Sequence, residues 1–160
     1  WVCERDGAQV QHYTSSGAPA GIVPVPAPSR VAVDSLTHAA WVTSFTNRSV
    51  YLISNLPALS KVFPGFSGPI GIAVDSRRGR VWVADAAGGA VVALNRVGGV
   101  EEFRVTGLGE PREIEVDLAS GEAWVTLAAT GQIARISPAG AVVLRSGGLI
   151  TPYGISLGAP

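Results

Sequence analysis

The chain has 160 residues, the usual size of one domain, and 47% of them are hydrophobic whereas 15% are charged. This composition excludes a disordered tail. Twelve basic residues balance twelve acidic residues, so the net charge offers no attraction to nucleic acid or to an anionic membrane surface.

The chain opens with two strand-like runs, Trp1 to Cys3 and Gln9 to Tyr13, that are rich in β-branched and aromatic residues. The longest stretch without a charged side chain, residues 7–29, overlaps the second run. Four prolines and three glycines interrupt this stretch, so it cannot form a membrane-spanning helix. We therefore expect strands and loops here, and no association with a membrane.

A period of about 41 residues runs through the whole chain. The four tryptophans stand at positions 1, 41, 82 and 124, and a valine follows each one. Seven residues before each of the last three, an aspartate closes an apolar triplet. These segments are Val31 to Asp34, Ile72 to Asp75 and Ile114 to Asp117, and Ile155 to Gly158 repeats the pattern with glycine in place of aspartate.

Each repeat predicts four short strands separated by glycine-rich turns. The apolar triplet forms strand A, the Trp-Val pair strand B, a β-branched run nine residues after the tryptophan strand C, and a weaker run strand D. Strands A and B are apolar almost throughout, which indicates sheets covered on both faces. A solenoid is the rival fold, but strand-built solenoid units usually have only about 20 to 30 residues. The sequence thus predicts an all-β protein, a β-propeller of four four-stranded blades.

One repeat carries a specific resemblance. The runs Gly71 to Asp75, Gly79 to Asp85 and Ala90 to Leu94 resemble an NHL-type β-propeller blade, in the group that includes YVTN-type and gluconolactonase-like propellers. The resemblance implies a ring of about six blades. It is not uniform, because the other repeats have Glu4, Ser44 and Leu127 at the position of Asp85.

The first repeat lacks a strand A of its own, and residues 154–157 near the end of the chain have the required pattern. We therefore expect one blade from residues 1–28 plus 152–160, and three more from residues 29–69, 70–110 and 111–151. Pairing of the terminal strands would remove two exposed sheet edges. Three arrangements fit this pattern: a closed four-blade monomer, a homodimer that exchanges terminal strands to form an eight-blade ring, and a part of a larger propeller.

The repeated aspartates, the tryptophans, the cysteine and the histidines each have a structural interpretation. The three repeated aspartates follow strand A, where a carboxylate stabilises a turn by accepting backbone N–H bonds, so we expect no metal there. The tryptophans fit buried wedges between blades better than a stacking surface. Cys3 fits a small packed residue, and His12 and His38 lie on a strand and in a turn. We expect no catalytic residue, no metal and no cofactor.

What remains is the loop face around the central opening, where the resembled propellers hold their ligands. Repeat alignment places seven residues at the start of strand A or the end of strand B, and they differ between repeats. These candidate ligand-binding residues are Glu4, Arg30, Ser44, Asp85, Arg112, Glu113 and Tyr153. The competing interpretation is a solvated rim with incidental charges.

Two functions stay open. The first is a non-catalytic binding or assembly scaffold for a protein or small ligand, because no nucleophile and base pair converges. The second follows from the resemblance: a metal-dependent lactonase or lyase of the gluconolactonase-like or streptogramin-lyase-like group. That enzyme would need carboxylate ligands such as Glu4, Asp85 and Glu113. The cellular compartment has no signature in the sequence.

Overall fold

The computed structural model describes residues 1–158, which form fifteen β-strands and no helix. The strands are β1 (Val2–Glu4), β2 (Gln9–Tyr13), β3 (Pro19–Pro24), β4 (Pro28–Val33), β5 (Ala40–Ser44), β6 (Ser49–Ile53), β7 (Leu59–Pro64), β8 (Pro69–Asp75), β9 (Arg80–Asp85), β10 (Ala90–Asn95), β11 (Glu101–Val105), β12 (Pro111–Val116), β13 (Ala123–Leu127), β14 (Gln132–Ile136) and β15 (Val142–Ser146). A membrane-spanning helix is accordingly not found in this range.

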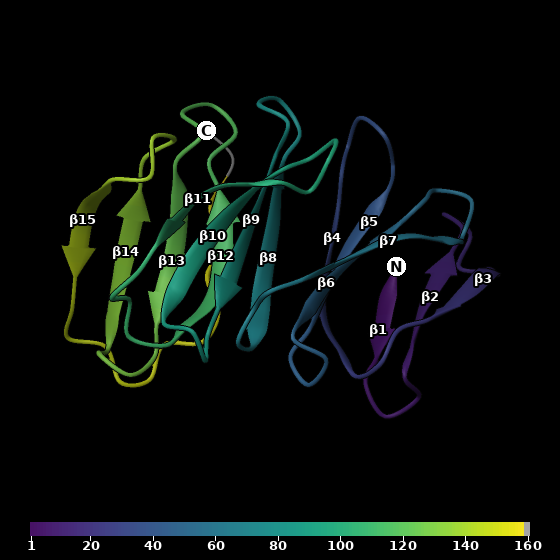
Figure 1. The fold of residues 1–160 in the computed structure, drawn as a ribbon, viewed down its shortest axis with the longest axis horizontal. Helices are drawn as coiled ribbons and strands as arrows, with labels where there is room; N and C mark the ends of the chain where they lie inside the picture. Colours follow the sequence, from purple (N-terminus) through teal and green to yellow (C-terminus); the bar gives the residue numbers. More distant parts are fainter. Residues whose placement is uncertain (159–160) are drawn as a thin grey trace.

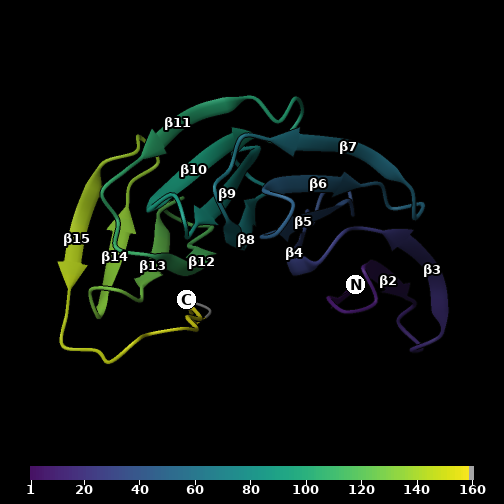
Figure 2. The ribbon, with the colours of Figure 1, turned by 60° about the horizontal axis from the view of Figure 1, so that its bottom comes forward.

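The strands form four antiparallel sheets. Three sheets have four strands each, in the orders β4 to β7, β8 to β11 and β12 to β15, and the first sheet has the order β1-β2-β3. The sheets stand side by side (Figure 1) along an arc whose inner side is formed by β4, β8 and β12 (Figure 2). β8 contacts both β4 and β12. The predicted all-β propeller fold with four blades is confirmed.

The C-terminal segment differs from the prediction that it completes the first sheet. Residues 152–158 form no strand, and the first sheet has three strands. The Thr126 hydroxyl donates to the Tyr153 carbonyl at 3.1 Å, as the Thr43 hydroxyl donates to the Ile70 carbonyl at 2.6 Å. Ile70 is the second residue of β8, the innermost strand of the sheet after that of Thr43. Tyr153 therefore takes the place of an innermost strand beyond the last sheet, and the C-terminal segment ends on the inner side of the arc (Figure 2). Residues 159 and 160 lie outside the described residues.

The core lies between neighbouring sheets, and two tryptophans fill it. Trp41 and Trp82 are 1% and 0% exposed. Trp41 belongs to an apolar cluster with Val83 of the next sheet, and Trp82 to a cluster with Val125 of the sheet after it. The predicted wedges are thus confirmed at these positions. Trp1 and Trp124, in the two outer sheets, are only half-buried.

A proline followed by a β-bulge begins each innermost strand. In β4, β8 and β12 the register with the neighbouring strand shifts directly after Pro28, Pro69 and Pro111, which are all buried. A bulge bends the strand and re-aims the side chain next to it. Pro152 stands at the same position of the repeat. The residues that directly follow the four prolines are Ser29, Ile70, Arg112 and Tyr153.

Candidate functional site

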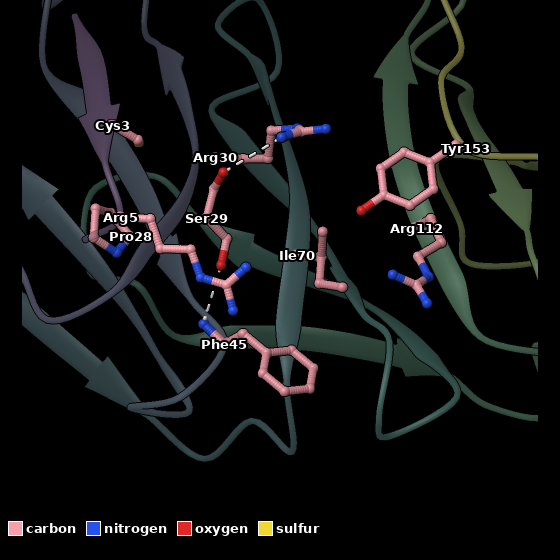
Figure 3. A pocket seen from close by; sticks show the side chains of 9 residues that line it. All are labelled: Cys3, Arg5, Pro28, Ser29, Arg30, Phe45, Ile70, Arg112 and Tyr153. Carbon is pink, nitrogen blue, oxygen red and sulfur yellow. Dashed lines mark hydrogen bonds between the residues drawn. The ribbon is translucent and has the colours of Figure 1, made fainter. Parts of the chain in front are cut away.

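These four post-proline residues line one cavity of about 390 Å³, at the entrance to the innermost strands (Figure 3). They come from three sheets and from the C-terminal segment, so the cavity belongs to the centre of the arc rather than to any single blade. Arg5 and Arg30 add two more guanidinium groups, and Cys3, Pro28 and Phe45 complete the wall. We call this cavity the central pocket.

Threonine hydroxyls fix the backbone at two sides of the central pocket. Thr43 Oγ1 accepts from the Arg30 N–H at 3.2 Å and donates to the Ile70 carbonyl of the next sheet. Thr126 repeats this arrangement, accepting from the Glu113 N–H at 3.0 Å and donating to the Tyr153 carbonyl. Thr43 thus connects β4 to β8, and Thr126 connects β12 to the C-terminal segment, at the point where the pocket residues begin.

An ion pair crosses the pocket rim between sheets that are not neighbours. Arg30 Nε donates to Glu113 Oε2 at 2.8 Å, from β4 to β12. The intervening strand β8 has Gly71 at the matching repeat position, and a Cβ there would lie 2.4 Å from the Arg112 carbonyl oxygen. Glycine is therefore required at this close approach. The hydrogen bond to Glu113 raises the pKa of Arg30 and outweighs the opposite effect of burial, so the guanidinium stays charged.

Arg112 is held by an aromatic ring and one carboxylate. Its guanidinium lies 5.3 Å from the centre of the Tyr153 ring, and its Nη2 donates to Glu110. Its Nε is buried and has no hydrogen-bond partner among the described residues. The Arg5 side chain is exposed and has no ion-pair partner within residues 1–158. In the described part of the chain, no acidic side chain lines the central pocket.

The structure thus brings together Arg30, Arg112, Glu113 and Tyr153 of the predicted site residues. Glu113 contacts the pocket through Arg30. The other three predicted residues lie at the end of strand B, as expected, but outside the pocket lining. Whether any of the seven binds a ligand stays a prediction.

The side chains of those three residues hold loops. Asp85 is fully buried and accepts backbone N–H bonds from Ser67 at 3.0 Å and Gly68 at 2.7 Å. Ser44 Oγ donates to the Pro26 carbonyl at 2.5 Å. The Glu4 carboxylate accepts from the side-chain amides of Gln9 and Gln11. In the second and third sheets, these hydrogen bonds fix the loop that leads into the innermost strand, β4 or β8.

Sequence reasoning missed Arg5, Ser29, Ile70 and Phe45 as pocket residues. A signal for two of them was present. Prolines at positions 28, 69, 111 and 152 keep the period of the tryptophans, and the residue after each proline enters the pocket wall.

The repeated aspartates stabilise turns, as predicted. Asp34 accepts from the Leu36 N–H at 3.0 Å, and Asp117 accepts from the Ala119 N–H at 2.8 Å. Asp75 likewise accepts from the Arg78 N–H at 3.0 Å. Within residues 1–158 there is no group of three or more His, Cys, Asp or Glu side chains placed to hold a metal ion.

No protein-family model matches the sequence, and no curated protein does. Solved structures do match. Virginiamycin B lyase from Staphylococcus aureus superposes with a TM-score of 0.82 at 20% identity, over 96% of this chain and 54% of that one. A chain of the nidogen–laminin complex gives 0.77 at 20% identity, over 91% and 59%. A candidate 6-phosphogluconolactonase from Bacteroides uniformis gives 0.77 at 13% identity, over 94% and 54%.

These likenesses confirm the β-propeller fold. At such low identity they bear on the fold alone. The chain spans about half the length of each of these three proteins. The names of the three include two enzymes and a protein complex, so the fold serves both catalysis and binding.

Proposed function

We propose that this chain is a non-catalytic β-propeller scaffold that binds a small ligand in the central pocket. One observation carries the proposal: the four post-proline positions converge on one cavity although they come from four different repeats. Their side chains are those of serine, isoleucine, arginine and tyrosine, whereas the tryptophans and most of the repeated aspartates do not vary. Positions freed from core packing are where a repeated scaffold accommodates function.

The size and lining of the pocket support a small-molecule ligand. Its volume of about 390 Å³ lies within the range of ligand sites, and its wall combines apolar side chains with three arginines, a serine and a tyrosine. Cys3 lines the pocket but does not suit the role of a nucleophile, because burial raises the pKa of its thiol to about 11. His12 stacks on Trp1 at 4.4 Å between ring centres, outside the pocket lining.

A metal-dependent lactonase or lyase is the second candidate. The names of two structural neighbours favour it. The resemblance of residues 71–94 to an NHL-type blade, in the group that includes gluconolactonase-like propellers, fits this candidate as well. The carboxylates that such an enzyme would need are engaged: Glu113 with Arg30, Asp85 with backbone N–H groups, and Glu4 with two glutamines. A metal would have to displace these partners.

Titration with Ca²⁺, Mg²⁺ and Mn²⁺ separates the two functions, since a cation that binds the folded state raises the melting temperature. The scaffold proposal expects no saturable rise with any of the three. A saturable rise that disappears in Glu113→Gln would favour the enzyme.

Methyl NMR of the full chain tests the proposal directly. A panel of neutral, cationic and anionic fragments is added while the Ile70 and Ile22 methyl signals are followed. Ile22 lies on the outer strand β3 and is 55% exposed, so it reports non-specific contact. We expect at least one fragment to shift Ile70 and leave Ile22 unchanged, and Ile70→Ala to weaken its binding whereas Ile22→Ala does not. Fragments that shift neither signal, or both alike, would contradict a ligand site in the pocket.

A further inference from the structure

We propose that the ligand of the central pocket is a small organic anion, a carboxylate or phosphate attached to an apolar ring. The arginines of the pocket wall hold the anionic group, while Ile70 and Phe45 contact the ring. This inference rests on the proposed function and names the ligand class for that same site.

The charge of the pocket wall is the first support. The chain as a whole has no net charge, yet three arginines and, within residues 1–158, no acidic side chain line this one cavity. Two of the three arginines have a carboxylate partner just outside the lining: Glu113 offsets Arg30 at 2.8 Å, and Glu110 offsets Arg112. Arg5 has no such partner among the described residues, so positive potential remains on the open side of the pocket. A concave surface lined by one sign of charge concentrates ligands of the opposite sign.

The accessible part of the Arg112 side chain is the second support. This side chain lines the pocket and is 26% exposed, although its Nε is buried and has no acceptor in the described part of the chain. A bound carboxylate or phosphate would contact the exposed part of the side chain, since the buried Nε offers no surface to a ligand. Arginine is also suited to the task, because its planar fork matches the geometry of both anions.

The neighbouring side chains define the rest of the ligand. The Tyr153 ring lies against the Arg112 guanidinium and limits how the fork can turn. Phe45 is 40% exposed although it is aromatic, and together with Ile70 it gives the pocket an apolar side. Figure 3 shows Ile70 between Arg5 on one side and Arg112 and Tyr153 on the other, with the Phe45 ring below it. An anion with a ring attached would use both parts of the wall, whereas a bare inorganic ion would use only one.

Isothermal titration of the full chain with matched probes tests this inference. The probes are benzoate, phenyl phosphate, the neutral isostere benzamide and inorganic phosphate. We expect one or both ring-bearing anions to bind, benzamide and inorganic phosphate to bind much more weakly, and added NaCl to reduce the affinity. Whether benzoate or phenyl phosphate binds more tightly identifies the anionic group.

Three arginine variants complete the test. Arg112→Gln and Arg5→Gln should each weaken anion binding, Arg112→Gln by about tenfold or more. Arg145→Gln is the control, since Arg145 is exposed on the outer strand β15 and should leave the affinity unchanged. Arg5 is itself exposed, so its variant remains informative if Arg112→Gln fails to fold.

Three outcomes would contradict the inference, each in a different way. Equal binding of benzamide and benzoate would overturn the anion inference but leave a ligand site in place. Anion binding that responds alike to all three arginine variants would place the anion elsewhere and overturn the inference. If no probe binds at millimolar concentration, the inference fails, and the methyl NMR panel then decides whether the pocket binds any ligand.

Discussion

The carboxylate of Asp34 is fully buried and accepts hydrogen bonds from two different sheets. Thr37 Oγ1 donates at 2.7 Å from the same turn, and Arg96 Nη1 donates at 2.7 Å from the turn between β10 and β11. Burial by itself would raise the pKa of Asp34, but these hydrogen bonds outweigh burial and lower the pKa to about 2. The ionised Asp34 carboxylate therefore stabilises the folded state.

This difference in pKa predicts an acid-sensitive contribution to stability. Because the folded-state pKa of about 2 lies below the ordinary value of about 3.9, the contribution is complete above pH ~4 and is lost as the pH falls toward 2. It should amount to about 2 to 3 kcal/mol. Urea unfolding at several pH values from 6 to 2.5 measures it. Asp34→Asn should show a flatter decline than the parent, whereas the exposed control Asp6→Asn should follow the parent. An unchanged slope in Asp34→Asn would contradict the assignment.

A second residue carries a backbone conformation that suits glycine. His38 has a φ of 59°, and the matching turns of the next two repeats have Gly79 and Gly121 at φ values of 67° and 79°. The left-handed conformation is costly for a residue with a Cβ. We expect His38→Gly to stabilise the fold by about 0.5 to 1 kcal/mol and Gly79→Ala to destabilise it by a similar amount. Thermal unfolding of the two variants checks both signs, and a loss of stability in His38→Gly would show that its side chain makes a contact that matters more than the strain.

At the scale of the element, the blades repeat more than their hydrophobic pattern. Strand D has one extra residue, a β-bulge, at the same place in every sheet. It lies opposite the step in strand C from His12 to Tyr13, Leu52 to Ile53, Ala93 to Leu94, and Arg135 to Ile136. These irregularities follow the spacing of the tryptophans. Bulges increase local strand twist, so a regular set of them helps to give each sheet the same shape.

The inter-sheet wedge leads to a prediction with an internal control. Trp82 is fully buried, with the Phe103 ring 5.5 Å away and sheets on both sides. Trp82→Ala should cost about 3 to 5 kcal/mol. Trp124 is half-buried and lines a gap beside Leu157, so Trp124→Ala should cost clearly less. Chemical denaturation of both variants measures the difference. Equal losses, or a loss below about 1 kcal/mol for Trp82→Ala, would contradict the wedge.

Much of the fold could be predicted from the sequence because the repeat is regular in its buried residues. Trp41 and Asp34 recur with one spacing and are both buried, and the apolar triplet of β4 keeps the same spacing. The pocket could be predicted only in part. Asp85 lies at the strand end where it was expected, but the loop of Ser67 and Gly68 covers it and supplies its partners. That loop has no periodic signature, so the direction of the side chain could not be inferred.

At the scale of the whole molecule, the sheets form an open arc (Figure 2). Specific contacts hold neighbouring sheets together on the side opposite the central pocket. Arg96 bonds to Asp34, Ser35 N–H donates to Ser76 Oγ at 3.0 Å, and Arg78 Nη2 donates to the Ala119 carbonyl at 2.9 Å. A gap of about 580 Å³ remains between β12, β13 and the C-terminal segment. The closed monomer, the strand-exchanged homodimer and the larger ring all stay proposals.

Deletion of residues 152–160 tests the position of the C-terminal segment. Since residues 152–158 contribute no strand, we expect all four sheets to survive and the circular dichroism spectrum to keep its β-sheet form. Trp124 should become more exposed, which shifts its fluorescence to longer wavelength. Light scattering of the parent gives the mass, with 16.4 kDa indicating a monomer and twice that value a dimer. Unfolding or aggregation of the deletion variant would instead indicate that the segment pairs with the first sheet in solution.

The buried prolines that begin the innermost strands have a consequence for engineering. Each proline sets the backbone, and the residue after it faces the opening without contributing to the core clusters. Ser29, Ile70, Arg112 and Tyr153 can therefore be randomised together in a selection library while the scaffold remains constant. Gene duplication would copy the buried scaffold residues together with the four variable positions. Single substitutions could then change one side of the opening at a time. New binding specificities could arise in this way while every intermediate sequence still folds.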